Sequence, residues 1–269
     1  MATLACFHAH PDDESIATGG VMAKAKQDGH RVVLVVVTRG ERGEIQPGVL
    51  DEGEALWERR VKETAAAAEV LGLDRVEFLG YEDSGMMGEP TNDLPGTFWT
   101  ADVDEAADRL AEILRQEQVD VLTVYDEHGN YGHPDHIQVH RVGHLAGERA
   151  GVSRVLEATM DRDFIRQGMA EAAELGDLPD DFEPPEHTEE SPFGSPADVI
   201  THEVDVTAFA DRKRRALAAH ASQVPPDSFF LSLDDDAFST AFGREWFIDP
   251  SRPRAPGAPR VADLFEGMS

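Results

Sequence analysis

The sequence predicts an α/β fold, in which a mostly parallel β-sheet lies between two layers of helices as a Rossmann-like three-layer sandwich, with a smaller C-terminal lobe. Short apolar segments alternate with segments of helical periodicity along the first part of the chain. Such alternation is typical of a sheet whose parallel strands are joined by right-handed helical crossovers. The segment from Arg31 to Thr38 is rich in β-branched residues and apolar on both faces, as a buried parallel strand requires.

The other elements follow from the same patterns of apolar runs and helix-end signals. The expected strands of the core are Leu4 to Phe7, Arg31 to Thr38, Arg75 to Leu79, Val119 to Tyr125 and Arg154 to Met160. The expected helices are Ser15 to Gln27, Glu54 to Leu71, Asp102 to Glu117 and His136 to Ala150. Gly72 is the expected cap of the second helix, because glycine readily adopts the left-handed backbone that ends many helices.

The alternation of strands and helices stops near Gly176, so we expect the chain to consist of three parts. These are a Rossmann-like core (residues 1–175), an acidic, proline-rich loop (residues 176–198) and a C-terminal lobe (residues 199–269) that completes a substrate site. Within the lobe, we expect a strand and helices at Val199 to Val206, Phe209 to Ala221 and Ala237 to Ile248.

Composition and charge exclude several classes of protein. The chain has 269 residues with 53 acidic and 24 basic side chains, giving a formal net charge of -29. Such a surface repels nucleic acid and anionic lipid, so we expect neither nucleic acid nor a membrane as a partner. Cys6 is the only cysteine, which excludes internal disulfides and zinc sites built from several thiolates. The longest apolar run, Val32 to Val37, is too short to span a bilayer, and the N-terminus carries no basic leader, so we expect a cytoplasmic protein.

The first cluster of polar side chains, from His10 to Glu14, directly follows the first strand and opens a helix. This junction lies at the carboxyl edge of a parallel sheet, where ligands bind. His10 and Asp13 can both reach one divalent ion from a tight turn, and the adjacent carboxylates of Asp12 and Asp13 repel each other unless a cation neutralises them. The alternative is that Asp12 or Asp13 simply caps the helix.

The second cluster, from Tyr131 to His136, follows the fourth strand and again opens a helix. An ordinary Gly/Pro turn with surface histidines is the alternative for this cluster taken alone. In a sheet with the strand order 3-2-1-4-5, however, the first and fourth strands flank the crevice where the order reverses. The two clusters are therefore expected to face each other across that crevice.

Other signals are weaker. His8 shares the strand face of His10 and is expected to pack or to support the site. His140 lies four residues after His136, but Ile137 stands where an H-E-x-x-H motif requires glutamate, so His140 is expected to be structural. No G-x-G-x-x-G follows the first strand, and no G-x-S-x-G is present, so neither a dinucleotide loop nor a serine hydrolase elbow is predicted.

Together, the motifs Ala9 to Glu14 (A-H-P-D-D-E) and His133 to His136 (H-P-D-H) resemble those of the PIG-L/LmbE-like N-acetylglucosaminyl deacetylases. The likeness extends over most of the chain and is greatest to the mycothiol-pathway branch, which contains a deacetylase and a conjugate amidase. The segments Thr38 to Glu44, Asp83 to Met86 and His220 to Gln223 look like parts of that branch.

The resemblance implies a role for each matching residue. His10, Asp13 and His136 would bind the metal, which would be Zn²⁺ or, in vivo, Fe²⁺. The implied catalytic groups are Asp12 as general base, His133 as general acid, Asp135 as the charged neighbour of His133, and Tyr131 as a donor to the oxyanion. The implied substrate contacts are Arg60 and Asp83, and the C-terminal lobe is expected to bring His220 back to the site, unless His220 is an ordinary histidine near a helix end.

The function expected from these residues is metal-dependent hydrolysis, in which metal-activated water deacetylates an N-acetylglucosaminyl-inositol-like substrate. One alternative is an amidase that cleaves mycothiol S-conjugates at the same nitrogen. An alternative of another class is a metal-binding partner protein without catalysis, which Asp12, Tyr131 and His133 disfavour because metal binding alone requires none of them. The expected partner is a small amino sugar, and the sequence leaves open whether the chain forms a homo-oligomer.

Overall fold

The computed structural model describes residues 1–175, 188 and 192–268, and they contain a seven-stranded sheet of order β3-β2-β1-β4-β5-β7-β6. The expected order 3-2-1-4-5 is confirmed, and the pairs within these five strands are parallel. The strands are β1 (Thr3–His8), β2 (Arg31–Val36), β3 (Arg75–Phe78), β4 (Val121–Tyr125), β5 (Arg154–Thr159), β6 (His202–Asp205) and β7 (Arg244–Ile248).

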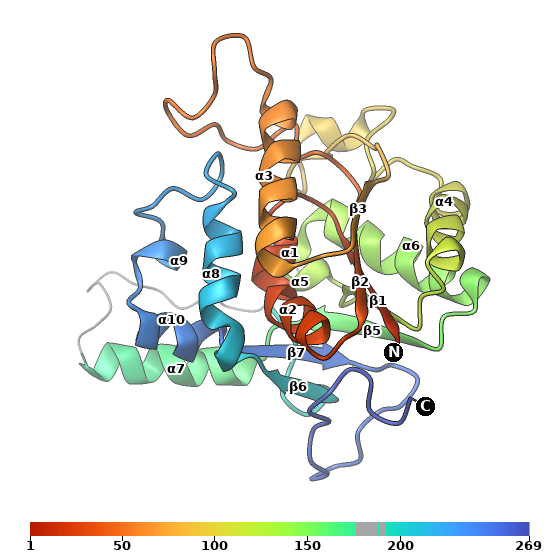
Figure 1. Cartoon of the computed structure of the whole chain (residues 1–269), viewed down its shortest axis with the longest axis vertical. Helices are drawn as coiled ribbons and strands as arrows, with labels where there is room; N and C mark the ends of the chain where they lie inside the picture. Colours follow the sequence, from red (N-terminus) through yellow and green to blue (C-terminus); the bar gives the residue numbers. More distant parts are fainter. Residues whose placement is uncertain (176–187, 189–191, 269) are drawn as a thin grey trace.

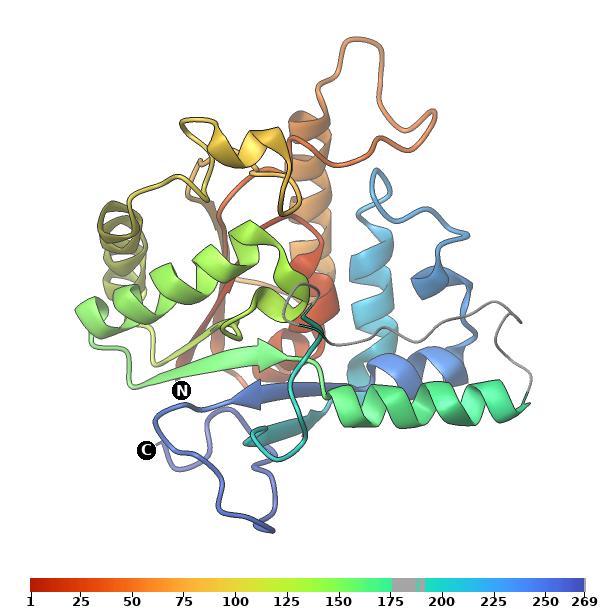
Figure 2. The same ribbon diagram turned by 180° about the vertical axis from the view of Figure 1, so that it is seen from behind.

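Helices cover both faces of this sheet, so the predicted three-layer α/β fold is confirmed (Figure 1 and, from behind, Figure 2). One face carries α1 (Asp13–Ala17), α2 (Gly19–Gln27), α3 (Leu56–Leu71) and α8 (Ala210–Ala218), and the other carries α4 (Val103–Gln116) and α6 (Pro134–Ala150). The remaining helical elements are η1 (Pro90–Asp93), α5 (Gly129–Gly132), α7 (Arg162–Leu175), η2 (Thr207–Phe209), α9 (Phe229–Ser232) and α10 (Asp235–Phe242).

The core lies on both sides of the sheet because neighbouring side chains of a strand point to opposite faces. On β1, Phe7 packs in the cluster that α4 and α6 cover, whereas Cys6 packs in the cluster that α2, α3 and α8 cover. Both side chains are fully buried. The near-continuous apolar runs of β1 and β2 follow from this burial on two faces.

Most expected elements are confirmed, but the helix expected over Ser15 to Gln27 is divided at Thr18. The Thr18 hydroxyl lies 2.8 Å from Nε2 of His8 and donates to the carbonyl oxygen of Glu14. These local hydrogen bonds hold the break between α1 and α2. Gly72 caps α3 with φ 79°, as expected.

The expectation of a helix over Ala237 to Ile248 is wrong in its second half. Helix α10 ends before Gly243, and the chain from Arg244 continues as strand β7. The strand pairs antiparallel with β5 and β6, where Trp246 and Phe247 are buried. Tertiary pairing with an existing sheet outweighs a helical pattern here, and aromatic residues suit a half-buried strand.

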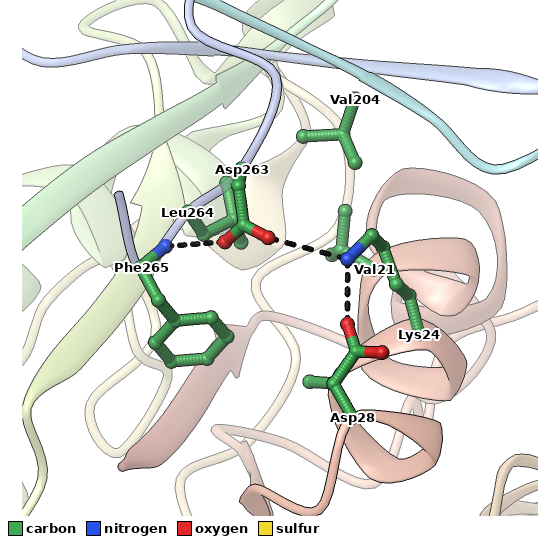
Figure 3. A pocket seen from close by; sticks show the side chains of 8 residues that line it. Val21, Lys24, Asp28, Val204, Asp263, Leu264 and Phe265 are labelled. Carbon is green, nitrogen blue, oxygen red and sulfur yellow. Dashed lines mark hydrogen bonds and ion pairs between the residues drawn. The ribbon is translucent and has the colours of Figure 1, made fainter. Parts of the chain in front are cut away.

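The C-terminal residues extend the same sheet and then return to α2. Figure 3 shows this contact, in which Lys24 donates hydrogen bonds to Asp28 and to Asp263. The backbone N–H of Phe265 also donates to Asp263. Of the loop expected over residues 176–198, residues 176–187 and 189–191 lie outside the described part. In the part of the chain that the structure describes, no helix is both long and apolar enough to cross a membrane.

Candidate active site

The topology brings the two polar clusters together. Strands β1 and β4 are hydrogen-bonded neighbours, and the clusters from His10 and from Tyr131 follow their carboxyl ends. The His10 and His136 rings lie 5.4 Å apart between centroids, and the His10 and His133 rings 4.6 Å apart. The expectation that the clusters face each other is therefore confirmed by the geometry.

Asp13 lies between the two histidines of the expected metal site. Its Oδ2 atom is 3.4 Å from Nδ1 of His10 and 3.3 Å from Nε2 of His136. Ligand atoms bound at 2.0–2.2 Å to a tetrahedral Zn²⁺ would lie about 3.3 Å apart, so these separations fit a zinc-type ion. Ligand atoms of His10, His133 and His136 also lie within 4.8 Å of one another. The donor set of buried imidazoles and a carboxylate therefore suits a divalent ion.

Asp135 lies near His133, as expected, but its carboxylate also contacts other residues of the site. Its carboxylate is 3.2 Å from Nε2 of His10 and accepts hydrogen bonds from the backbone and hydroxyl of Ser84. The carboxylate fixes the orientation of a metal-site histidine, as carboxylates behind metal-bound histidines commonly do. Asp83 is also close, with Oδ1 3.6 Å from Nε2 of His10.

The two adjacent carboxylates have different environments. Although burial alone would raise the pKa of Asp13, His136 and His10 hold it well below its usual range. Burial raises the pKa of Asp12 to about 6, although Arg60 opposes the shift. In many active sites, two carboxylates have well-separated pKa values. One of them then stabilises charge and the other transfers a proton.

Asp12 is held in an unusual backbone conformation. Its φ is 99°, a value that side-chain-bearing residues rarely adopt. The backbone N–H of Asp12 donates to Oε2 of Glu14, and Arg60 donates to the Asp12 carboxylate at 3.1 Å. Arg60 also donates to the carbonyl oxygens of Pro11 and Gly40. The buried guanidinium of Arg60 thus fixes Asp12, and its expected contact with substrate stays a prediction.

Glu14 is a site residue for which no role was predicted, although it stands within the first motif. Its Oε1 atom lies 2.7 Å from Nε2 of His220 and accepts a hydrogen bond from the hydroxyl of Ser15. His220 is fully buried and contacts Glu14, and its expected contact with substrate stays a prediction. The C-terminal lobe does reach the site through His220, but it acts on the turn that carries Asp12.

The ring of His133 is neutral in the resting site. Burial lowers the pKa of His133 to about 3, and His10 and His136 add to this effect while Asp135 opposes it. Asp135 favours the charged form of His133, as expected, but burial and the other two histidines outweigh it in the resting site, and a charged His133 during amine protonation stays a prediction. Nδ1 of His133 accepts the backbone N–H of Asp135, which places the ring proton on Nε2.

Tyr131 stands at the exposed side of the site. Its side chain is half-exposed, and its hydroxyl lies 3.3 Å from Nε2 of His136. The preceding residue, Asn130, has a positive φ of 64°, so the chain turns sharply just before Tyr131. Burial of the phenol group among carboxylates raises its pKa above the usual value, so the hydroxyl keeps its proton and can donate it in a hydrogen bond.

The fold and the site are those of a PIG-L family protein. The model of that family, described as GlcNAc-PI de-N-acetylase, matches residues 5–146, so the chain belongs to it. The resemblance seen in the motifs is thus confirmed. A 1D-myo-inositol 2-acetamido-2-deoxy-alpha-D-glucopyranoside deacetylase of Acidothermus cellulolyticus is 42% identical over 100% of this chain and 96% of its own. The enzyme of the same name from Thermomonospora curvata is 39% identical over 97% of this chain and 95% of its own.

Solved structures agree on the fold. A conserved protein of Thermus thermophilus has a TM-score of 0.60 at 23% identity and covers 96% of this chain and 100% of its own. The N,N'-diacetylchitobiose deacetylase of Pyrococcus horikoshii has a TM-score of 0.53 at 25% identity and covers 84% of this chain and 72% of its own.

Proposed function

We propose that this protein hydrolyses the acetamide of an N-acetylglucosaminyl-inositol-like substrate, releasing acetate and the free amino sugar. The observation that carries the proposal is the pair of neighbouring carboxylates with separated pKa values, Asp13 between two histidines and Asp12 beside Arg60. The inositol-containing substrates in the names of the relatives support the choice of amino sugar.

His10, Asp13 and His136 would hold a Zn²⁺ or Fe²⁺ ion, with Asp135 orienting His10. When bound, such an ion lowers the pKa of coordinated water and polarises a carbonyl group. The low pKa of Asp13 supports this role, because the carboxylate remains ionised without having to lose a proton at neutral pH.

Asp12 is the proposed general base. With its pKa raised to about 6, Asp12 is mostly ionised at neutral pH and yet basic enough to take a proton from water. Arg60 and Glu14 fix its side chain and backbone, so the carboxylate stays turned to one position. A base of this kind contributes about a hundredfold to ten-thousandfold to the rate.

Tyr131 would stabilise the carbonyl oxygen of the acetyl group, and His133 would protonate the leaving nitrogen. The protonated Tyr131 hydroxyl donates to the negative oxygen that develops from the acetyl carbonyl, and losing one such donor typically costs about 3–4 kcal/mol in other enzymes. His133 delivers a proton to the departing amine. Because His133 begins neutral, it would first take up the proton that Asp12 removed from the water and then pass it to the amine nitrogen.

Acetate release from N-acetylglucosaminyl-inositol tests the proposal. We expect release by the zinc-loaded protein, loss of release after a chelator, and recovery after Zn²⁺ is restored. Parallel assays with a mycothiol S-conjugate identify an amidase if that substrate is cleaved faster. Tight metal binding without release from any N-acetyl sugar would refute the proposal and favour a non-catalytic metal-binding protein.

A further inference from the structure

A second group of side chains that could bind a metal lies between the middle of α6 and β5, apart from the proposed active site. His140 and His144 stand one helical turn apart on α6, and Glu157 projects from β5 beneath them. Ligand atoms of these three side chains lie within 4.8 Å of one another. Nothing in the proposed reaction uses any of them.

The ring of His140 is oriented as metal-binding rings commonly are. Nδ1 of His140 donates a hydrogen bond to the carbonyl oxygen of Tyr125 at 2.9 Å, since a carbonyl can only accept. This bond places the ring proton on Nδ1 and leaves Nε2 of His140 as a lone-pair donor, the arrangement in which a backbone carbonyl supports a metal-bound histidine. The rings of His140 and His144 lie 4.6 Å apart between centroids.

The carboxylate of Glu157 has no strong cation beside it. Its side chain is 12% exposed, and Nε2 of His144 lies 2.9 Å and Nδ1 of His140 3.7 Å from Oε1. Among the described residues, its ion-pair partners are these histidines and no lysine or arginine. A largely buried carboxylate is costly without a compensating charge. Ligand atoms of one tetrahedral Zn²⁺ lie about 3.3 Å apart, so the 2.9 Å between Nε2 of His144 and Oε1 of Glu157 is about 0.4 Å short of the separation that an ion requires.

We propose that His140, His144 and Glu157 form a second divalent-metal site that takes a borderline ion such as Zn²⁺ and joins α6 to β5. Two imidazoles at i and i+4 of a helix with one carboxylate from a neighbouring strand supply the nitrogen and oxygen donors that zinc prefers. Arg141 follows His140 where a zinc protease helix would carry its glutamate base, so the site is structural. The bound ion would stabilise α6, which follows His133 and carries His136 in its first turn.

Zinc stoichiometry of the full chain tests this site. The protein is stripped with a chelator, dialysed against buffered Zn²⁺, and its zinc measured by mass spectrometry. We expect two equivalents in the unmodified protein and one in His144→Ala and in Glu157→Gln, which is nearly isosteric and keeps the fold. Glu148→Gln, an exposed carboxylate on the same helix, is the matched control and should keep both equivalents.

A second pair of variants separates this site from the active site. His136→Ala should retain one equivalent, and added Zn²⁺ should raise its melting temperature, whereas His136→Ala combined with His144→Ala should lose both the ion and the shift. His144→Ala alone should keep its acetate release. If His144→Ala and Glu157→Gln bind as much zinc as the unmodified protein, or if His136→Ala binds none, the second site does not exist.

Discussion

At the scale of single residues, the chemistry depends on how Asp12 and Asp13 are made different. Asp13 contacts two histidine nitrogens, whereas Asp12 contacts Arg60 and has its backbone held by Glu14. Two adjacent carboxylates with the same contacts would titrate as a coupled pair, whereas the different contacts here give the low pKa to Asp13 and the raised one to Asp12. Asp12 has φ 99° and its carboxylate contacts Arg60, whereas that of Asp13 contacts His136, so the base and the metal ligand have separate partners.

The pKa of Asp12 predicts how the rate depends on pH. Protonated Asp12 cannot accept a proton, so kcat/KM should fall as pH decreases through the pKa of about 6. A bound cation favours the ionised form, which moves this acidic limb to a lower pH. A pH profile of acetate release measures the limb. A rate that rises as the pH falls from 7 to 5 would contradict the role of Asp12 as a base.

Replacing Glu14 with glutamine should lower kcat while leaving KM and zinc content nearly unchanged. Glu14 accepts at both oxygens, from Asp12 N–H at one and from Ser15 and His220 at the other. A glutamine can accept at only one end, so one of these contacts is lost. Hydrogen bonds to charged groups contribute about 1.5–3 kcal/mol, which corresponds to roughly tenfold to hundredfold in kcat.

Steady-state kinetics and zinc analysis of Glu14→Gln separate positioning from plain instability. Glu58→Gln, which changes an exposed acid at the start of α3, is the control. Loss of zinc in step with activity would show that Glu14 supports the metal site instead of Asp12.

At the scale of elements, the site depends on the close approach of α6 to the sheet. Helix α6 begins with the residues that follow His133 and lies against β4 at Gly143. A Cβ atom added at Gly143 would lie 2.3 Å from Cγ1 of Val124, closer than real Cβ contacts allow. Gly143 therefore sets the distance between the helix that carries His136 and the strand before the second cluster.

Gly143→Ala should destabilise the protein by about 1–3 kcal/mol, because the added methyl group overpacks the α6–β4 interface. Urea unfolding monitored by circular dichroism gives the free energy. Gly168→Ala on α7 is the matched control, since nothing lies within 4 Å of its added Cβ atom. Equal stability of the two variants would show that α6 can shift freely.

The sequence predicts the elements well where local pattern and burial agree. The two-sided apolar run of β2 and the glycine cap of α3 are confirmed, as is the meeting of the clusters from His10 and Tyr131. Strand β7 was expected as helix because its pairing partners lie far away in sequence. The contacts of Asp135 and His220 could not be predicted for the same reason, since Ser84 and Glu14 reach them only in the folded chain.

At the scale of the whole molecule, the C-terminal residues close the fold around the first helices. Glu245 on β7 accepts hydrogen bonds from the backbone N–H groups of Gly20 and Val21 at the start of α2. Lys213 on α8 donates to the same carboxylate at 2.7 Å, and both side chains are buried. This contact joins the sheet, α2 and α8, and so supports the lobe that carries His220.

Lys213→Met should destabilise the protein by about 3–5 kcal/mol, because removing one partner leaves Glu245 buried without its counter-charge. Arg215→Met, in an exposed pair with Asp211 on the same helix, should change stability little. Chemical unfolding of both variants measures the difference. A neutral effect of Lys213→Met would show that the backbone donors of α2 suffice for Glu245.

The central claim is that two distant loops share one cation and assign separate tasks to neighbouring carboxylates. Zinc content and acetate release measured together on Asp12→Ala and His136→Ala test it most directly. We predict that Asp12→Ala keeps its zinc but loses about a hundredfold to ten-thousandfold in rate, whereas His136→Ala loses zinc at the active site together with activity. Full activity in Asp12→Ala, or unchanged active-site zinc in His136→Ala, would contradict it.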